Sequence, residues 1–81
     1  MTKQIQATNY IKSLLMSRRF TIEPGIVLIG DEGWQVFDYQ RKCLAIDPNG
    51  GVWVGPSGGK WNPLGACTVS NGLYAIEFLT K

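Results

Sequence analysis

The spacing of apolar residues changes near residue 25, and the change divides the chain into two parts. The stretch Lys3–Arg18 contains no glycine or proline, and its apolar residues recur every three or four positions. This period is typical of a helix with one apolar face. The apolar positions are Ala7, Ile11, Leu14 and Leu15. We therefore predict an N-terminal amphipathic helix, capped by Thr2 and unable to continue through Pro24 and Gly25.

After the helix, β-branched and aromatic residues come in short runs separated by Gly, Asp, Asn and Pro. Such runs are typical of a meander of antiparallel strands. A turn at residues 30–33 joins the run Ile26–Ile29 to the run Trp34–Tyr39, but both faces are apolar here and the register stays open. A bend near Gln40-Arg41 divides residues 34–47 into two strands, and the alternative is one long bent strand.

The segment Asp47-Pro48-Asn49-Gly50 predicts a tight turn, because proline presets its second position and glycine accepts positive φ. Ile46 then pairs with Val52, and Trp53 falls on the other face of the sheet beside Cys43 and Ala45. The predicted core face holds Leu44, Ile46, Val52 and Val54.

Asn71-Gly72 predicts a second two-residue hairpin turn, since this dipeptide tolerates positive φ at both positions. The hairpin pairs Val69 with Tyr74 and Cys67 with Ile76. The predicted fold class is therefore α+β: an N-terminal amphipathic helix followed by a five- or six-stranded antiparallel meander, as an open sheet or a small barrel. In outline it resembles the small barrels of Sm-like and SH3-like proteins, a likeness of fold that implies no function.

Composition limits the classes of protein to which this chain can belong. The 81 residues are 44% hydrophobic and 17% charged, which predicts a single packed domain spanning residues 1–81. The formal net charge of +2 is too close to balance to indicate nucleic acid or an anionic membrane by itself. The longest apolar run is far shorter than the about 20 residues of a membrane helix, so we expect no membrane partner.

The chain contains no histidine, the commonest general base and metal ligand, which disfavours an enzyme. Cys43 and Cys67 are too few for the four ligands of a structural zinc site, and we expect neither a metal nor a cofactor. No secretory signal precedes these two cysteines, and so sparse a set favours reduced thiols and a cytoplasmic location.

The stretch Asn49–Gly65 holds six of the ten glycines and two of the three tryptophans. It contains part of the phosphate-binding pattern G-x-x-x-x-G-K-[ST], but Val54 stands at the first glycine and Trp61 at the final Ser or Thr. The hairpin turn explains the beginning of this stretch. Residues 56–65 remain as a loop with one lysine and one tryptophan, and we place the candidate function there.

The predicted function is that of a small non-enzymatic binding protein acting through protein contacts. Tryptophan and arginine are enriched at interface hot spots, which makes Trp53, Lys60, Trp61 and Arg41 the candidate binding residues. In the competing interpretation, Trp53 or Trp61 only covers the second face of the sheet beneath the helix. Alternatively, two copies of the chain form a homodimer through such a surface. Size alone suggests a phage or mobile-element accessory protein.

Single-stranded nucleic acid is the alternative partner, because such proteins combine aromatic stacking platforms with cations. This interpretation is less favoured, since acidic residues occupy the neighbouring turns and would repel phosphate. These residues are Asp31, Glu32, Asp38 and Asp47.

Overall fold

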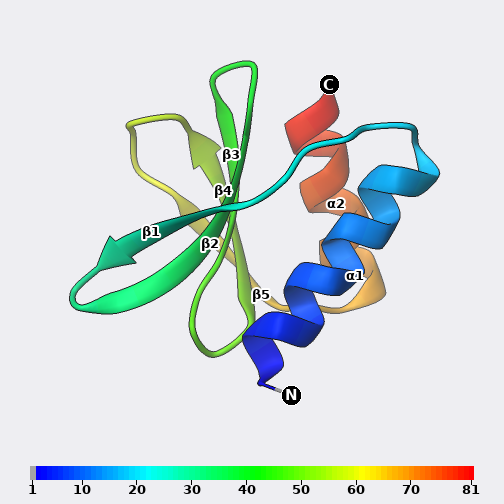
Figure 1. Ribbon diagram of the computed structural model, residues 1–81. Coiled ribbons are helices and arrows are strands. Elements are labelled where there is room, and N and C mark those ends of the chain that lie inside the picture. Colours follow the sequence, from blue (N-terminus) through cyan, green and yellow to red (C-terminus); the bar gives the residue numbers. More distant parts are fainter. Residues whose placement is uncertain (1) are drawn as a thin grey trace.

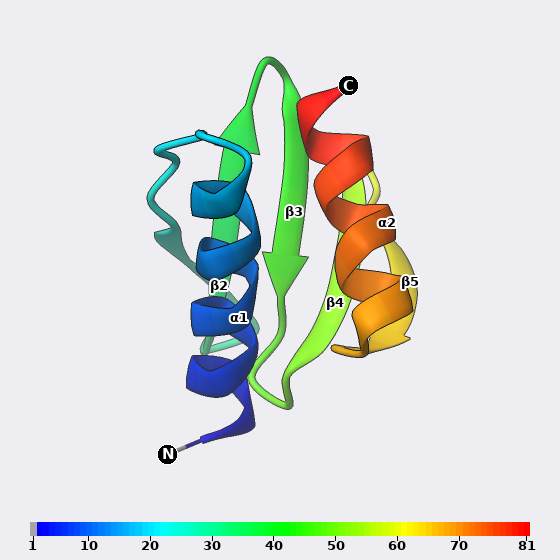
Figure 2. The same cartoon turned by 90° about the vertical axis from the view of Figure 1, so that its right-hand side faces the viewer.

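The computed structural model describes residues 2–81 and places two helices on one face of an antiparallel sheet (Figure 1, Figure 2). Its elements are α1 (Lys3–Ser17), β1 (Gly25–Ile29), β2 (Glu32–Tyr39), β3 (Lys42–Ile46), β4 (Gly51–Pro56), β5 (Asn62–Ala66) and α2 (Val69–Thr80). The five strands follow the order β1-β2-β3-β4-β5, and the sheet stays open. The predicted α+β class, with its N-terminal helix and antiparallel meander, is confirmed.

Helix α1 begins and ends at local hydrogen bonds. The Thr2 hydroxyl accepts a hydrogen bond from the Ile5 amide at 3.1 Å, as expected of an N-cap. At the other end the Phe20 amide donates to the Leu15 carbonyl at 3.0 Å, while Arg19 adopts a left-handed φ of 64°. The helix therefore ends at Ser17, with Arg18 as its C-cap. Its buried residues are Ala7, Thr8, Ile11 and Leu15.

Two hairpins are closed by two-residue turns in which both residues have positive φ. Gly30 and Asp31, at 58° and 65°, connect β1 to β2. Gln40 and Arg41, at 50° and 66°, connect β2 to β3. Positive φ at both positions defines the type I′ turn, whose twist matches that of the paired strands. The bend near Gln40-Arg41 is thus a tight turn, and the alternative of one long strand is wrong.

The hairpin of β3 and β4 has the predicted register. Ile46 pairs with Val52 and Ala45 with Trp53, and Gly50 takes a φ of 84° in the turn. One face of this hairpin packs against both helices and forms the main core. The buried residues of the core are Ala7, Ile11, Leu15, Phe37, Leu44, Ile46, Val52, Val54, Ala75, Ile76 and Leu79. The predicted core face of β3 and β4 is therefore confirmed.

The predicted hairpin at Asn71-Gly72 is wrong, because this dipeptide lies in the first turn of α2. The Thr68 hydroxyl accepts a hydrogen bond from the Asn71 amide at 3.2 Å, and the Asn71 side chain donates to the Ala66 carbonyl at 2.7 Å. Gly72 is buried against α1, where an added Cβ would lie 2.9 Å from Tyr10 Cε2. The glycine therefore permits close helix packing and does not form a turn.

Buried residues of α2 recur every three or four positions, as in a helix. Apolar residues of the same segment also alternate as in a strand, and that alternation favoured the predicted hairpin. The residues facing the core are Gly72, Ala75, Ile76 and Leu79, spaced by three, one and three positions. The predicted pairs of Val69 with Tyr74 and Cys67 with Ile76 do not form. Val69 and Tyr74 are instead exposed on the outer side of α2.

Strand β5 occupies part of the stretch predicted to be a loop. It pairs with β4, with Pro63 opposite Trp53 and an irregular register between Val52 and Trp53. Gly65 has a φ of 107°, which only glycine adopts readily. Proline and glycine hide this strand in the sequence, because both are depleted from regular strands. The connecting loop is thereby shortened to residues 57–61.

Candidate functional site

Three tryptophans gather on the face of the sheet that lies opposite the helices. Trp34 comes from β2, Trp53 from β4, and Trp61 from the end of the loop that precedes β5. The ring centroid of Trp34 lies 5.3 Å from that of Trp53 and 6.0 Å from that of Trp61. We call this surface the tryptophan face. Beneath the rings lie the buried side chains of Val36, Cys43 and Ala45.

Trp53 is held in place by the turn between β3 and β4. Its indole Nε1 donates to Asp47 Oδ2 at 2.8 Å. The other carboxylate oxygen of Asp47 accepts hydrogen bonds from the amides of Asn49 and Gly51 at 2.8 and 2.9 Å. One carboxylate therefore fixes both the turn and the ring. The predicted placement of Trp53 beside Cys43 and Ala45, away from the core, is confirmed.

Trp61 folds back over the sheet because residue 55 is glycine. A Cβ added at Gly55 would lie 2.6 Å from both the Lys60 carbonyl oxygen and Trp61 Cδ1. The indole Nε1 of Trp61 donates to the Pro56 carbonyl at 3.1 Å, which closes the loop on itself. Gly55 thus leaves the space in which Trp61 packs against the sheet.

Trp34 was missing from the predicted site residues although it contacts both other rings. The two-residue turn at Gln40-Arg41 pairs Val36 with Ala45, and Trp34 projects from the same side of β2 as Val36. That register was the available signal. The sequence alone does not fix it, because the bend between β2 and β3 has no turn dipeptide that sets the pairing.

Arg41 and Lys60 lie in two loops that adjoin at one end of the sheet. The amide of Ser57 donates to the Arg41 carbonyl at 2.9 Å, and the Ser57 hydroxyl donates to Asp38 Oδ2 at 3.1 Å. Both cationic side chains are exposed, whereas all three tryptophans are half-buried. The structure therefore groups Trp53 and Trp61 on one face and brings the loops of Arg41 and Lys60 together at its margin.

The two cysteines are free thiols on opposite sides of the sheet. Cys43 is buried beneath the tryptophans, and Cys67 packs against the main core. Burial raises the pKa of both thiols above their ordinary value of 9.0, and the negative charge of Asp38 raises the pKa of Cys43 further. Within residues 2–81, no group of three or more His, Cys, Asp or Glu side chains is placed to hold a metal ion.

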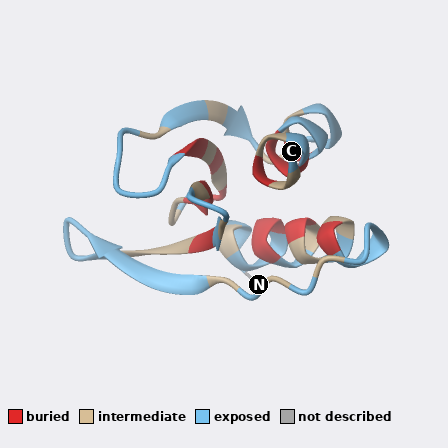
Figure 3. Cartoon of the chain, turned by 90° about the horizontal axis from the view of Figure 1, so that it is seen from above, coloured by how far each residue is buried: buried red, intermediate tan, exposed pale blue. Residues whose placement is uncertain are grey.

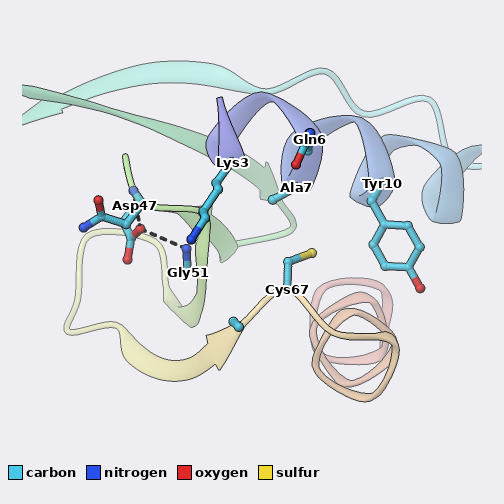
Figure 4. A pocket seen from close by; sticks show the side chains of 10 residues that line it. Lys3, Gln6, Ala7, Tyr10, Asp47, Gly51 and Cys67 are labelled. Atoms are coloured by element: carbon cyan, nitrogen blue, oxygen red, sulfur yellow. Dashed lines mark hydrogen bonds between the residues drawn. The ribbon is translucent and has the colours of Figure 1, made fainter. Parts of the chain in front are cut away.

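An open cleft of about 570 Å³ is lined by the first turns of α1, by the turn between β3 and β4, and by residues 66–67 (Figure 4). Lys3 and Tyr10 line one wall, and Cys67 directs its sulfur toward α1 from the opposite wall. Asp47 also lines the cleft, but its carboxylate is occupied by the turn and by Trp53. Because this carboxylate already has hydrogen-bond partners, the cleft is a weaker candidate for ligand binding than the tryptophan face.

Comparison with protein-family models, curated proteins and solved structures found no match to this chain. No helix within residues 2–81 combines the length and the apolar character needed to cross a lipid bilayer. The candidate site is therefore defined by geometry alone, as the tryptophan face and the adjoining loops of Arg41 and Lys60.

Proposed function

We propose that this chain is a small non-enzymatic binding protein and that the tryptophan face contacts another protein. The observation that supports this proposal is the gathering of three half-buried indoles on the sheet face opposite the two helices (Figure 1). Tryptophan is the residue most characteristic of interface hot spots, where a rigid ring supplies a large buried area.

The residues around the rings suggest the chemistry of the partner. Trp61 and Trp34 would supply buried apolar area, while exposed Arg41 and Lys60 would pair with carboxylates at the rim. The partner we propose is therefore a protein surface with an apolar centre and an acidic margin. The glycines of the loop would allow its backbone to approach closely.

The test compares wild type with Trp61→Ala in binding and in stability. Capture from the native host by wild type, followed by purification of the captured protein, supplies the partner for affinity measurements. We expect Trp61→Ala to weaken binding at least about tenfold, as for a hot-spot residue. Tyr74→Ala, which removes an exposed ring from α2 instead, is the matched control and should leave the affinity unchanged.

Thermal unfolding of the same variants separates the two interpretations of Trp61. Because the ring is half-buried, we expect its removal to cost about 1–2 kcal/mol, less than a core tryptophan. A loss of several kcal/mol would assign Trp61 to the core. Equal affinities of wild type and Trp61→Ala for the purified partner would contradict the proposed surface.

Single-stranded nucleic acid is a second candidate ligand for the same surface, since the loops that carry the cations Arg41 and Lys60 adjoin the face that carries the indole rings. A titration with labelled oligothymidylate, followed by tryptophan fluorescence, tests it at low and moderate salt. Phosphate contacts predict quenching and a steep loss of affinity as salt rises. The absence of binding even at low salt would remove this candidate.

A further inference from the structure

Strand β1 has the sequence of a buried strand but lies exposed at an edge of the sheet. All residues of Gly25–Ile29 are exposed, and Ile26 and Leu28 expose 70% and 75% of their surface. Figure 3 shows the hairpin of β1 and β2 projecting beyond the helices, with β1 pale blue along its length. An unbroken apolar run is typical of strands covered on both faces. Both faces of β1 lack that cover.

The opposite edge of the sheet has features that hinder pairing with another strand, and β1 lacks these features. Strand β5 contains Pro63, a glycine with left-handed φ at Gly65, and an irregular pairing with β4. Proline and bulges are the features with which proteins prevent another strand from pairing at an edge. Strand β1 contains neither a proline nor a charged residue among its five positions. One edge of this sheet is thus closed to pairing and the other is open.

The register of the hairpin fixes which backbone groups point outward. In a two-residue hairpin the residues flanking the turn, here Ile29 and Glu32, exchange both hydrogen bonds, and alternate pairs follow the same pattern. Val27 therefore bonds toward β2, opposite Trp34. The N–H and C=O groups of Ile26 and Leu28 face away from the sheet. They offer two donors and two acceptors to an incoming strand.

Charge around the hairpin favours one kind of occupant. Residues 20–40 contain four of the six acidic side chains and none of the eight basic ones. The acidic residues are Glu23, Asp31, Glu32 and Asp38. Glu23 is paired with Lys12 at 3.0 Å, while Asp31 and Glu32 are exposed at the turn. The turn end of the open edge is therefore acidic, although the net charge of the chain is positive.

A second copy of this chain fits the edge poorly. If two β1 strands paired antiparallel about Val27, the turn with Asp31 and Glu32 in one copy would approach the segment before β1 in the other. Residues 20–40 of that copy contain Glu23 but no lysine or arginine to pair with the turn. Like charges placed opposite each other destabilise a strand pair. The same acidic residues would attract lysine or arginine on a different strand.

We propose that β1 accepts an extended segment of another protein as an added strand, with an apolar centre and lysine or arginine at the end beside Asp31 and Glu32. Hydrogen bonds to Ile26 and Leu28 would supply the pairing, and apolar side chains of the segment would lie beside those of β1 on each face of the sheet. Val27 and Trp34 share one face, so the added strand would also extend the tryptophan face. This site is distinct from the proposed contact through Trp61 and does not depend on it.

The test uses the blocked peptide KKVIVIKK, with EEVIVIEE as a matched control of opposite charge. Amide hydrogen exchange by NMR gives the decisive readout, because strand addition protects the outward amides of Ile26 and Leu28. At saturating KKVIVIKK we expect about a tenfold slowing of exchange at these two amides. EEVIVIEE should bind about tenfold more weakly at low salt, because its carboxylates meet an acidic edge.

Two variants connect the binding to the edge itself. Leu28→Pro removes an outward N–H without removing a bond to β2, and it should abolish binding of KKVIVIKK. The double variant Asp31→Lys, Glu32→Lys keeps the strand sequence and should reverse the preference between the two peptides. Trp61→Ala should bind KKVIVIKK with unchanged affinity, which separates this site from the proposed contact of the tryptophan face.

Three outcomes would overturn the proposal. The first is that KKVIVIKK does not protect the amides of Ile26 and Leu28. The second is that the charge-reversed variant keeps the preference of wild type. The third is that these amides become protected in the protein alone as its concentration rises, which would identify a second copy as the occupant.

Discussion

The two faces of the sheet bury alternate residues of the same strands in different ways. On β2, Phe37 points into the core beneath the helices and is fully buried, whereas Trp34 projects from the other side and is half-buried. One face is covered by separate helices. The other is covered only by large side chains of the sheet and its loop, which bury the residues beneath them but leave their own rings partly in solvent. A face covered in this way is buried enough to be ordered and exposed enough to bind.

The largest expected effect is the difference between Phe37→Ala and Trp34→Ala on the same strand. Removing a fully buried phenylalanine from a well-packed core costs about 3–5 kcal/mol. Removing the half-buried Trp34 should cost about 1–2 kcal/mol, because much of its ring stays in water in the folded state. Urea unfolding of the two variants measures both values.

Equal losses for the two variants would break this comparison. In that case the tryptophan face would be a second core, and a contact with another protein would be a less favoured explanation of its rings. The slope of unfolding free energy against urea must stay constant across the variants, because a changed slope would indicate a change in the unfolded state or loss of two-state behaviour.

Local signals predicted the hairpin of β3 and β4 and the beginning of α1. The turn at Asp47–Gly50 fixes the register of β3 and β4, and that register alone separates the core residues from Trp53. Thr2 likewise marks the beginning of α1. In each case the controlling residues lie within a few positions of the structure they determine, so the sequence pattern suffices.

Where the local structure depends on contacts with residues far away in the sequence, the sequence pattern was misleading. Gly72 packs against Tyr10, sixty-two positions away, a contact that Asn71-Gly72 taken alone does not reveal, since this dipeptide resembles a turn. Strand β5 exists because β4 pairs with it, despite Pro63. Trp34 was missed for a related reason, since its face follows from pairing across the Gln40-Arg41 turn. Trp53 and Trp61 were identified by residue type, and only the fold showed that they share a surface.

A smaller effect is expected when the anchor of Trp53 is removed. Trp53→Phe keeps an aromatic ring but deletes the N–H that donates to Asp47 at 2.8 Å. Loss of a partly buried hydrogen bond to a carboxylate should cost about 1–2 kcal/mol. Urea unfolding gives the value, and a double-mutant cycle with Asp47→Asn isolates the pair from the other bonds of Asp47.

This cycle sharpens the contrast between the faces. A coupling energy near zero would mean that the ring is held by packing alone, as the residues of the main core are. A clear coupling would show that the tryptophan face needs polar anchors where the core needs none. Trp61→Phe, which deletes the donor to the Pro56 carbonyl, is the matched variant in the loop.

The smallest effect concerns the two thiols, one on each side of the sheet. Folding raises the pKa of Cys43 and Cys67 above 9.0, chiefly through burial. The unfolded chain therefore releases these protons first as pH rises, so it binds fewer protons than the folded chain. Stability is fully retained below pH 9 and declines as the pH rises above it. Unfolding by urea between pH 7 and 10 measures the decline, and Cys43→Ala and Cys67→Ala should each reduce its slope.

The rate of alkylation by iodoacetamide distinguishes the two thiols, because they are buried to different extents. Cys67 is half-buried and faces the cleft of Figure 4, whereas Cys43 is 3% exposed beneath the indoles. Cys67 should react first, and Trp61→Ala should accelerate only Cys43. If Trp61→Ala accelerated both thiols equally, the variant would be opening the whole fold. A selective effect on Cys43 would show that Trp61 shields its own face of the sheet, because the thiol on the helix side would keep its protection.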